Sequence, residues 1–278
     1  MKMRLKNKFV LIPGASRPIG RAIAREFGIA GAFLILPHYD WPDSTREMAE
    51  EFEAAGFSFH LFPADLCDET AVKQLVAETK KHTVHLDFLI NNIERGGMPA
   101  VHGSYDLEHN KEQWDLEITT TLKAKWLLYH HCLPLMQNNP GGGSILNISS
   151  ISALTGRSGP GSHFFNDSYS AANRAIASFT ELWSREAAPD IRVNELMLGL
   201  IDSRHGPGTR GWETLTEKEK TEIHNHILLN RTGQPEEVAK TAFFLAVEAS
   251  YMTGAILKMD GGFTLGGDEV PTIPAGLL

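Results

Sequence analysis

The chain has 278 residues, of which 42% are hydrophobic and 22% are charged, and it carries a formal net charge of −8 at pH 7. This length is enough for one large α/β domain with a substantial core. The negative charge argues against general binding to nucleic acid, which requires a basic face, and no stretch approaches the roughly 18 apolar residues of a membrane span. The only cysteines, Cys67 and Cys132, are too few for a disulfide framework or a thiolate zinc cluster. We therefore expect a cytoplasmic protein with a small-molecule substrate.

Short apolar segments alternate with helical patterns along the whole chain. Ile19, Ile23 and Phe27 form one apolar face and predict a first helix, and Asp68 is placed to cap a later one, because its side chain can accept a backbone N–H bond. The predicted strands span residues 8–12, 31–36, 57–62, 86–91, 143–149, 191–198 and 255–259. The other predicted helices span residues 44–55, 68–81, 111–137, 168–187 and 235–248.

The predicted strands show no alternation of apolar and polar residues, which is typical of parallel strands buried on both faces. Such strands, joined by helices, form a doubly wound sheet in which ligands bind at the carboxyl ends of the strands. We predict an α/β, Rossmann-like fold with a single domain over residues 1–278. A polar excursion over residues 204–230 and a carboxyl-terminal tail over residues 263–278 extend from it.

Gly14 and Gly20 bracket a turn between the first predicted strand and the first predicted helix. The amino terminus of a helix presents free N–H groups and a positive dipole end to a phosphate, and glycine lets the backbone approach closely. Pro18 fits the first helical turn, although it removes one potential donor. The sheet context favours a phosphate-binding turn over a tight turn without a ligand.

Ser150 and Tyr169 lie on either side of a glycine-rich segment. Ser150 follows a predicted strand, and Tyr169 begins a predicted helix. Between them, the glycines and proline of residues 156–162 predict no regular structure. The two hydroxyl groups can therefore meet at the carboxyl edge of the sheet. Asn173 follows Tyr169 by four residues and lies on the same face of the helix.

Over nearly its whole length the chain resembles the short-chain dehydrogenase/reductase family. The turn from Gly14 to Gly20 resembles the family's cofactor loop, residues 91–94 (Asn-Asn-Ile-Glu) resemble its Asn-Asn-Ala-Gly element, and residues 231–238 and 251–262 resemble its carboxyl-terminal pattern. The resemblance implies an NAD(P)-dependent oxidoreductase that interconverts a carbonyl and an alcohol. The cofactor contacts that it implies are Gly14, Ser16, Arg17, Ile19, Gly20, His38, Asp65, Leu66, Asn91, Asn173, Gly199, Ile201 and Ser203.

By the same resemblance, Tyr169 exchanges the alcohol proton and Ser150 orients the carbonyl. The family's lysine, which lowers the pKa of the tyrosine, corresponds to Asn173, and the asparagine of the preceding helix corresponds to Thr121. An uncharged Asn173 cannot favour a phenolate as an ammonium would. Tyr169 therefore needs activation from elsewhere. The sources considered are the positive charge of the oxidised nicotinamide, Arg157 and His163, of which the last two are favoured as exposed loop side chains.

The choice between NADP and NAD depends on the end of the second strand. NAD sites usually carry an acid there, whereas this chain has His38, with Asp40 two residues on. Arg17 corresponds to a position where NADP-preferring relatives place a base for the 2′-phosphate. NADP is therefore favoured, with NAD as the alternative, and a purely solvated Arg17 is equally compatible. Glu94 would repel phosphates at close range unless it turned outward.

Other functions remain open from the sequence. The loss of the lysine and the asparagine suits a cofactor-binding protein that has lost catalysis and acts as a sensor or partner subunit. Halohydrin dehalogenases resemble the family and also lack the lysine, but Gly14 and Asp65 argue against chemistry without a nicotinamide. We expect no metal site, because the histidine pairs at 130–131 and 224–226 lack an evident third ligand. The resemblance also implies a homodimer or homotetramer formed through helices 111–137 and 168–187.

Overall fold

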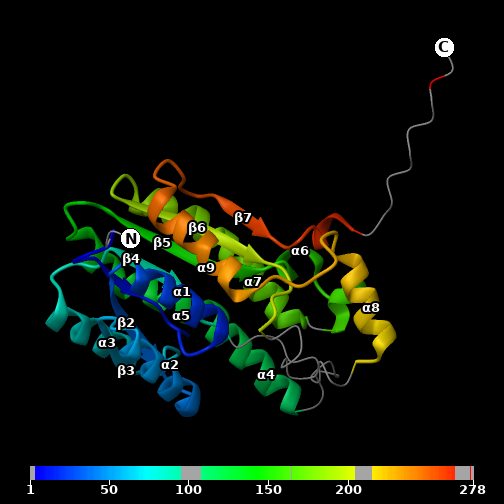
Figure 1. The fold of residues 1–278 in the computed structure, drawn as a ribbon, viewed down its shortest axis with the longest axis horizontal. Coiled ribbons are helices and arrows are strands. Elements are labelled where there is room, and N and C mark those ends of the chain that lie inside the picture. The colour runs from blue at the N-terminus through cyan, green and yellow to red at the C-terminus, as the bar shows by residue number, and fades with distance from the viewer. Residues whose placement is uncertain (1–3, 95–107, 164, 204–214, 267–275, 277–278) are drawn as a thin grey trace.

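A computed structural model describes residues 4–94, 108–163, 165–203, 215–266 and 276 (Figure 1). Within these ranges seven strands, all parallel, form one sheet in the order β3-β2-β1-β4-β5-β6-β7. The strand order reverses between β1 and β4, which confirms the predicted doubly wound arrangement. The strands are β1 (Phe9–Leu11), β2 (Phe33–His38), β3 (Phe59–Pro63), β4 (Phe88–Asn91), β5 (Gly143–Ser150), β6 (Ile191–Leu198) and β7 (Ile256–Met259).

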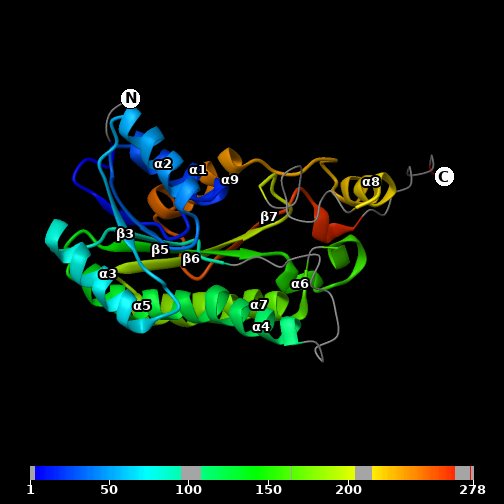
Figure 2. The ribbon, with the colours of Figure 1, turned by 90° about the horizontal axis from the view of Figure 1, so that it is seen from below.

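Helices cover both faces of the sheet. Figure 2 shows α1, α2 and α9 on one face and α3, α4, α5 and α7 on the other, with α6 and α8 beyond one end. Among the described residues, no helix combines the length and the apolar character needed to cross a membrane. The helical segments are α1 (Pro18–Ile29), α2 (Pro42–Ala54), α3 (Glu69–His82), α4 (Glu108–Ile118), η2 (Thr119–Lys123), α5 (Ala124–Gln137), α6 (Ser152–Thr155), η3 (Gly159–His163), α7 (Asp167–Ala187), α8 (Glu217–His226), α9 (Pro235–Phe243), η5 (Phe244–Glu248) and η6 (Phe263–Leu265).

Successive residues of each strand pack into two different cores. Val10 lies in the core that contains Phe27 of α1, whereas Leu11 lies in the core that contains Leu128 of α5. All four side chains are essentially inaccessible to solvent. Because a strand directs alternate side chains to opposite faces, a sheet covered on both faces requires apolar residues at both, and this explains the unbroken apolar runs in the sequence.

Capping residues fix where two of the helices begin. The Asp68 side chain accepts the Thr70 N–H at 2.9 Å at the start of α3, which confirms its predicted role. At the start of α7, the Asn166 side chain accepts the Tyr169 N–H at 2.7 Å. This cap starts α7 at Asp167, one residue earlier than predicted, and it holds Tyr169 in the first turn.

The helix predicted over residues 111–137 begins at Glu108 and contains a π-helical turn, η2. In this turn the Ala124 N–H bonds to the Thr119 carbonyl, five residues back, instead of the usual four. The prediction of one regular helix was therefore wrong in its middle. Such π turns occur mostly at functional sites and leave no hydrophobic-periodicity signal over so few residues.

The glycine-rich segment 156–162 also differs from its prediction. Its second half belongs to η3, a 3-10 helix over Gly159–His163. Pro160 is compatible with this turn because its fixed φ lies within the range of a 3-10 helix. Gly156 and Gly159, with φ of 55° and 56°, supply the left-handed backbone that lets the chain enter it.

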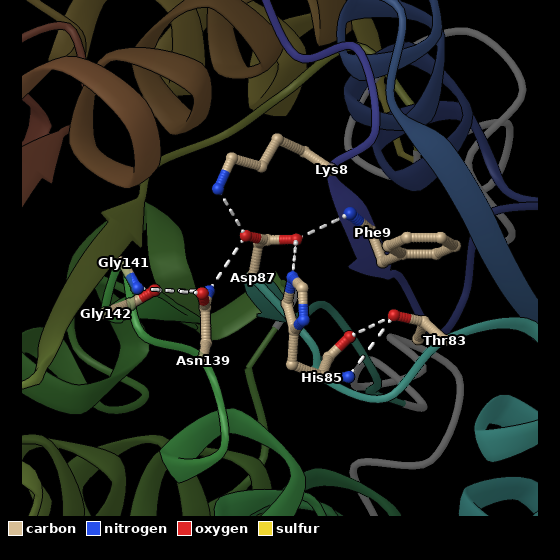
Figure 3. A network of polar contacts seen from close by, with 8 residues as sticks. All are labelled: Lys8, Phe9, Thr83, His85, Asp87, Asn139, Gly141 and Gly142. Carbon is tan, nitrogen blue, oxygen red and sulfur yellow. Dashed lines mark hydrogen bonds and ion pairs between the residues drawn. The ribbon is translucent and has the colours of Figure 1, made fainter.

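A buried carboxylate links three segments at the amino edge of the sheet, which is the edge opposite Ser150. Asp87 accepts bonds from Lys8 Nζ at 2.8 Å, from the Phe9 N–H at 2.9 Å and from Asn139 Nδ2 at 2.8 Å (Figure 3). His85 Nε2 lies 3.6 Å from its second oxygen. The Asp87 side chain is only 3% exposed. It therefore connects β1, the approach to β4 and the turn before β5 from a single buried position.

Candidate active site

Ser150 and Tyr169 meet at the carboxyl edge of the sheet. Ser150 is the last residue of β5, and Tyr169 lies in the first turn of α7 with 2% of its surface exposed. The Ser150 side chain is close enough to Tyr169 to lower the pKa of the phenol. The Tyr169 hydroxyl donates to Glu94 Oε2 at 3.0 Å. Burial and the neighbouring Glu94 carboxylate hold the pKa of Tyr169 well above its usual value, and Ser150 only partly opposes them.

Asn173 is fully buried one turn after Tyr169. Its Nδ2 donates to the Tyr169 carbonyl at 3.0 Å, whereas its Oδ1 has no hydrogen-bond partner within the described residues. A buried acceptor without a donor is costly. Asn173 is therefore suited to accept a hydrogen bond from a ligand hydroxyl, as the cofactor role inferred from the sequence requires.

Thr121 lies in the π turn η2 and is fully buried. Its hydroxyl donates to Glu117 Oε1 at 3.4 Å. The backbone carbonyl of Thr121 accepts a hydrogen bond from Lys125 Nζ at 3.2 Å. Thr121 therefore binds the Lys125 ammonium through its backbone carbonyl, while its side chain binds Glu117.

Lys125, on α5, was not identified from the sequence. It is 1% exposed, and its ammonium also donates to the Ile93 carbonyl. Burial lowers the pKa of Lys125 to about 8, while Glu94, Glu195 and Glu117 act in the opposite direction. The only signal in the sequence was a lysine four residues after Thr121, on the same helix face.

The predicted phosphate turn is tightly closed. Gly14 has a φ of 69°, and a side chain at Gly20 would overlap the Gly14 carbonyl. Ser16 is buried, and Ile19 packs against the core. Pro18 occupies the first turn of α1, and no side chain caps the backbone N–H groups there. Both glycines are thus required by the turn itself, which leaves the N–H groups at the start of α1 without a competing side chain.

Arg17 lies between α1 and α2. Its guanidinium lies 4.2 Å from the centre of the Trp41 ring, and its Nη1 is 3.4 Å from Ser44 Oγ. His38 ends β2 and is half-buried, and this burial lowers its pKa. The contacts of Arg17 make it more ordered than the solvated side chain considered as the alternative, and they hold a cation close to the carboxyl end of β2.

The remaining predicted cofactor residues follow the ends of β3, β4 and β6. Asp65 accepts the Cys67 N–H at 2.9 Å, and Leu66 is buried beside it. Asn91 is fully buried, and its Nδ2 donates to Asn147 Oδ1 at 2.9 Å, so its side chain faces the interior of the sheet. Gly199, Ile201 and Ser203 follow the end of β6. Gly199 packs against Asp260, and Ile201 forms an isolated β-bridge with Gly233.

The basic groups proposed to enter the pocket do not both do so. Arg157 pairs with Asp167 at 2.9 Å, and both side chains are at least half exposed, as the favoured interpretation expected. The side chain of His163 lies outside the described part of the structure. Among the described residues, Lys125 of α5 brings a positive charge close to Glu94, the partner of Tyr169.

One group of side chains has the spacing of metal ligands, in a place that the sequence did not single out. Ligand atoms of His60, Glu78 and His82 lie within 4.8 Å of one another. Lys81 already pairs with Glu78 at 2.6 Å. His60 is near the beginning of β3 and His82 at the end of α3, which places the cluster at the amino edge of the sheet.

Comparisons with known proteins agree with this geometry. Residues 14–264 match the family described as enoyl-(acyl carrier protein) reductase. The chain is 30% identical over 269 residues to a 3-oxoacyl-(acyl-carrier-protein) reductase of Thermotoga maritima, covering 95% of this chain and 100% of that protein. It is 32% identical over 264 residues to glucose 1-dehydrogenase 2 of Bacillus subtilis, covering 94% and 96%.

A solved structure shows the same similarity. The 3-oxoacyl-(acyl-carrier protein) reductase of Brucella melitensis aligns with a TM-score of 0.80 at 26% identity, covering 94% of this chain and 92% of that chain. These relatives favour an active oxidoreductase over a protein that has lost catalysis. The chain therefore belongs to the short-chain dehydrogenase/reductase family and is an NAD(P)-dependent oxidoreductase of the carbonyl/alcohol type.

Proposed function

We propose that this protein reduces a small carbonyl compound with NADPH, and that Ser150 and Tyr169 are its catalytic residues. The observation that carries the proposal is the proximity of these two hydroxyl-bearing side chains, which come from β5 and α7 and are close enough for Ser150 to act on the Tyr169 pKa. Two convergent hydroxyl donors can hold one carbonyl oxygen and stabilise the negative charge that develops on it.

The nicotinamide cofactor would supply the hydride. The residues that would hold it are those around the Gly14 turn, Asp65, the segment Gly199 to Ser203, and Asn173. The unpartnered Oδ1 of Asn173 supports this assignment, because it offers a buried acceptor to a sugar hydroxyl. Asn173 would thus retain the binding role of the family's lysine without its charge.

Tyr169 would act as the proton donor. As the carbonyl carbon is reduced, the hydroxyl proton passes from Tyr169 to the carbonyl oxygen, while Ser150 holds that oxygen. The raised pKa of Tyr169 keeps the phenol protonated across the neutral range, which suits donation better than abstraction. Oxidation of the alcohol requires the phenolate, so its rate should rise with pH, by up to about tenfold per unit below the pKa.

The preference for NADPH is supported by two features near β2. Arg17 is held by Trp41 and Ser44, and β2 ends in His38 where a carboxylate would favour NAD. A fixed guanidinium suits a 2′-phosphate because it offers several donors with a permanent charge.

Residues 204–230 would cover the substrate. In their described part, Ile223 and Ile227 of the α8 region share one apolar cluster with Tyr169, Phe165 and Phe263. This packing supports a lid that rests directly on the catalytic residues. The tail over residues 263–278 lies mostly outside the described ranges.

The protein would assemble as a homodimer or homotetramer through α5 and α7. Trp126 on α5 and Leu182 on α7 are large apolar side chains that are 44% and 57% exposed, and apolar groups of this kind are enriched at interfaces. Light scattering should give a mass of at least two chains, and Trp126→Lys should lower it. A monomeric wild-type protein would contradict the assembly.

A panel of carbonyl compounds, followed through NADPH absorbance, tests the function. We expect turnover that Tyr169→Phe lowers at least 100-fold and Ser150→Ala at least tenfold, with NADPH affinity unchanged in both. These losses follow from removing a proton donor and an oxyanion donor. Tight NADPH binding without turnover of any compound would instead support a protein that has lost catalysis, and absence of binding would reopen chemistry without a nicotinamide.

A further inference from the structure

Lys125 brings a buried ammonium to the catalytic residues from an unexpected direction. The family's lysine would lie on α7, at position 173, whereas Lys125 projects from α5. It donates to the carbonyl of Ile93, the residue before Glu94, and to the carbonyl of Thr121. Glu94 in turn accepts the Tyr169 hydroxyl bond. One cation is therefore linked to Tyr169 through two adjacent residues, Ile93 and Glu94.

The surroundings of Lys125 are strongly negative. Glu94 after β4, Glu117 on α4 and Glu195 on β6 all act on its charge. Glu195 also accepts hydrogen bonds from Ser149 and Thr180. The charge of Arg174 on α7 acts to lower the pKa of Glu195. Glu117 also acts on Tyr169. Without a cation, the buried carboxylates of Glu117 and Glu195 and the half-buried carboxylate of Glu94 would repel one another and any phenolate formed beside them.

A buried ammonium is costly unless it is paired. Lys125 lies beside two departures from the family pattern, because it binds the carbonyl of Thr121 and the carbonyl of the residue before Glu94. An apolar residue would fill this position on α5 at lower cost. The coincidence of these replacements around one buried cation indicates that the charge lost from α7 is supplied from α5.

We propose that Lys125 is the positioning residue of this active site, and that its ammonium holds the Ile93–Glu94 turn and balances the Glu94 carboxylate to which the Tyr169 hydroxyl is bonded. This inference rests on the proposed reductase function. When Tyr169 gives its proton to the carbonyl oxygen, a phenolate remains beside Glu94 and regains its proton from solvent water. The ammonium lowers the electrostatic cost of that phenolate, so its loss should lower kcat more than it raises KM.

Charge removal at position 125 tests the proposal. Lys125→Met should lower kcat for carbonyl reduction at least 30-fold and change the Kd for NADPH less than threefold. Lys125→Arg should retain at least a third of kcat, and the matched control Lys123→Met, an exposed lysine on the same segment, should be unaffected. Lys125→Met with kcat within threefold of the wild type would overturn the proposal.

Relocation of the charge provides the sharper test. The double variant Lys125→Met/Asn173→Lys carries the ammonium where the family has it, and it should recover at least tenfold of the lost kcat. A double variant no faster than Lys125→Met would overturn the proposal, because a merely structural lysine at 125 would not be replaced from α7.

The pH profile keeps the proposal testable if Lys125→Met does not fold. Since the pKa of Lys125 is lowered to about 8, its ammonium is lost as the pH rises through that value. We expect kcat for reduction to fall above about pH 8 in the wild type but not in Lys125→Arg, because a guanidinium stays charged. Identical profiles would overturn the proposal.

Ultraviolet titration separates this inference from the reductase function. Phenolate absorbance, with Tyr169→Phe as the reference, reports the ionisation of Tyr169 without turnover. Because the Lys125 ammonium is already lost above about pH 8, the informative variant is Lys125→Arg, whose permanent charge should lower the pH at which Tyr169 ionises by at least one unit relative to the wild type. A protein that binds NADPH without turnover but shows this shift would contradict only the function, whereas an unchanged titration would contradict the role of Lys125.

Discussion

Arg17 illustrates how one side chain is prepared for a ligand. The Trp41 ring and the Ser44 hydroxyl hold its guanidinium between α1 and α2. A cation over an aromatic face keeps its charge while losing conformational freedom, so part of the entropic cost of binding an anion is already met.

The prediction at this scale is a change of cofactor preference. Arg17→Gln should raise the Kd for NADPH by about 10- to 100-fold, the equivalent of a charged hydrogen bond of about 1.5–3 kcal/mol. The Kd for NADH should change less than threefold, as fluorescence titration can show. Arg25→Gln, on the same helix and paired with Glu51, is the control. An equal loss for both cofactors would contradict a 2′-phosphate contact.

Single residues were predictable from the sequence where they belong to a local motif. Ser150, Tyr169 and Asp68 stand next to strand ends or helix starts, and the structure places each as expected. Lys125 was not predictable, because its role depends on α5 lying beside the segment after β4. Glu94 was expected to repel phosphates unless it turned outward; its bond to the Tyr169 hydroxyl was not predicted.

At the scale of elements, α8 is held by a capping box. The Thr216 hydroxyl accepts the Glu219 N–H at 3.3 Å, and the Glu219 carboxylate accepts the Thr216 N–H at 2.7 Å. Most of α8 is exposed, but Ile223 is fully buried. The helix therefore depends on its cap and on few core contacts for its order.

Loss of this cap should loosen the lid. Thr216→Ala should destabilise α8 by about 1 kcal/mol, raise KM about threefold or more and leave kcat nearly unchanged. Steady-state kinetics and amide hydrogen exchange of α8 measure the two effects. Thr221→Ala, the same chemical change one turn later, should do neither. Faster exchange without a change in KM would show that α8 does not cover the substrate.

Most strands and helices were predictable because each spans enough residues for its pattern of apolar side chains to be recognised. All strands were placed within two residues of their observed limits at each end, since each contains a group of apolar residues bounded by turn-forming or polar segments. The π turn η2 and the 3-10 helix η3 were missed because each spans only five residues. Segments this short carry no period, and their hydrogen bonds are decided by the neighbouring elements.

For the whole molecule, Asp87 should contribute to stability without taking part in catalysis. Asp87→Ala leaves Asn139 Nδ2 and the Phe9 N–H without their charged acceptor, so we expect a loss of about 2 kcal/mol in the free energy of unfolding. Urea denaturation measures this loss. Asp43→Ala, which removes an exposed carboxylate, is the control. A changed Kd for NADPH would contradict the separation of the two edges.

That separation has a consequence for how such a chain can diverge. The Asp87 network (Figure 3) stabilises one edge of the parallel sheet. Ser150, Tyr169 and the segments after β4 and β6 lie at the other edge. Substitutions at the catalytic edge can therefore accumulate without loosening the closure of the fold. A lysine can disappear from one helix and another arise on its neighbour, because the scaffold that aligns the two helices is secured elsewhere.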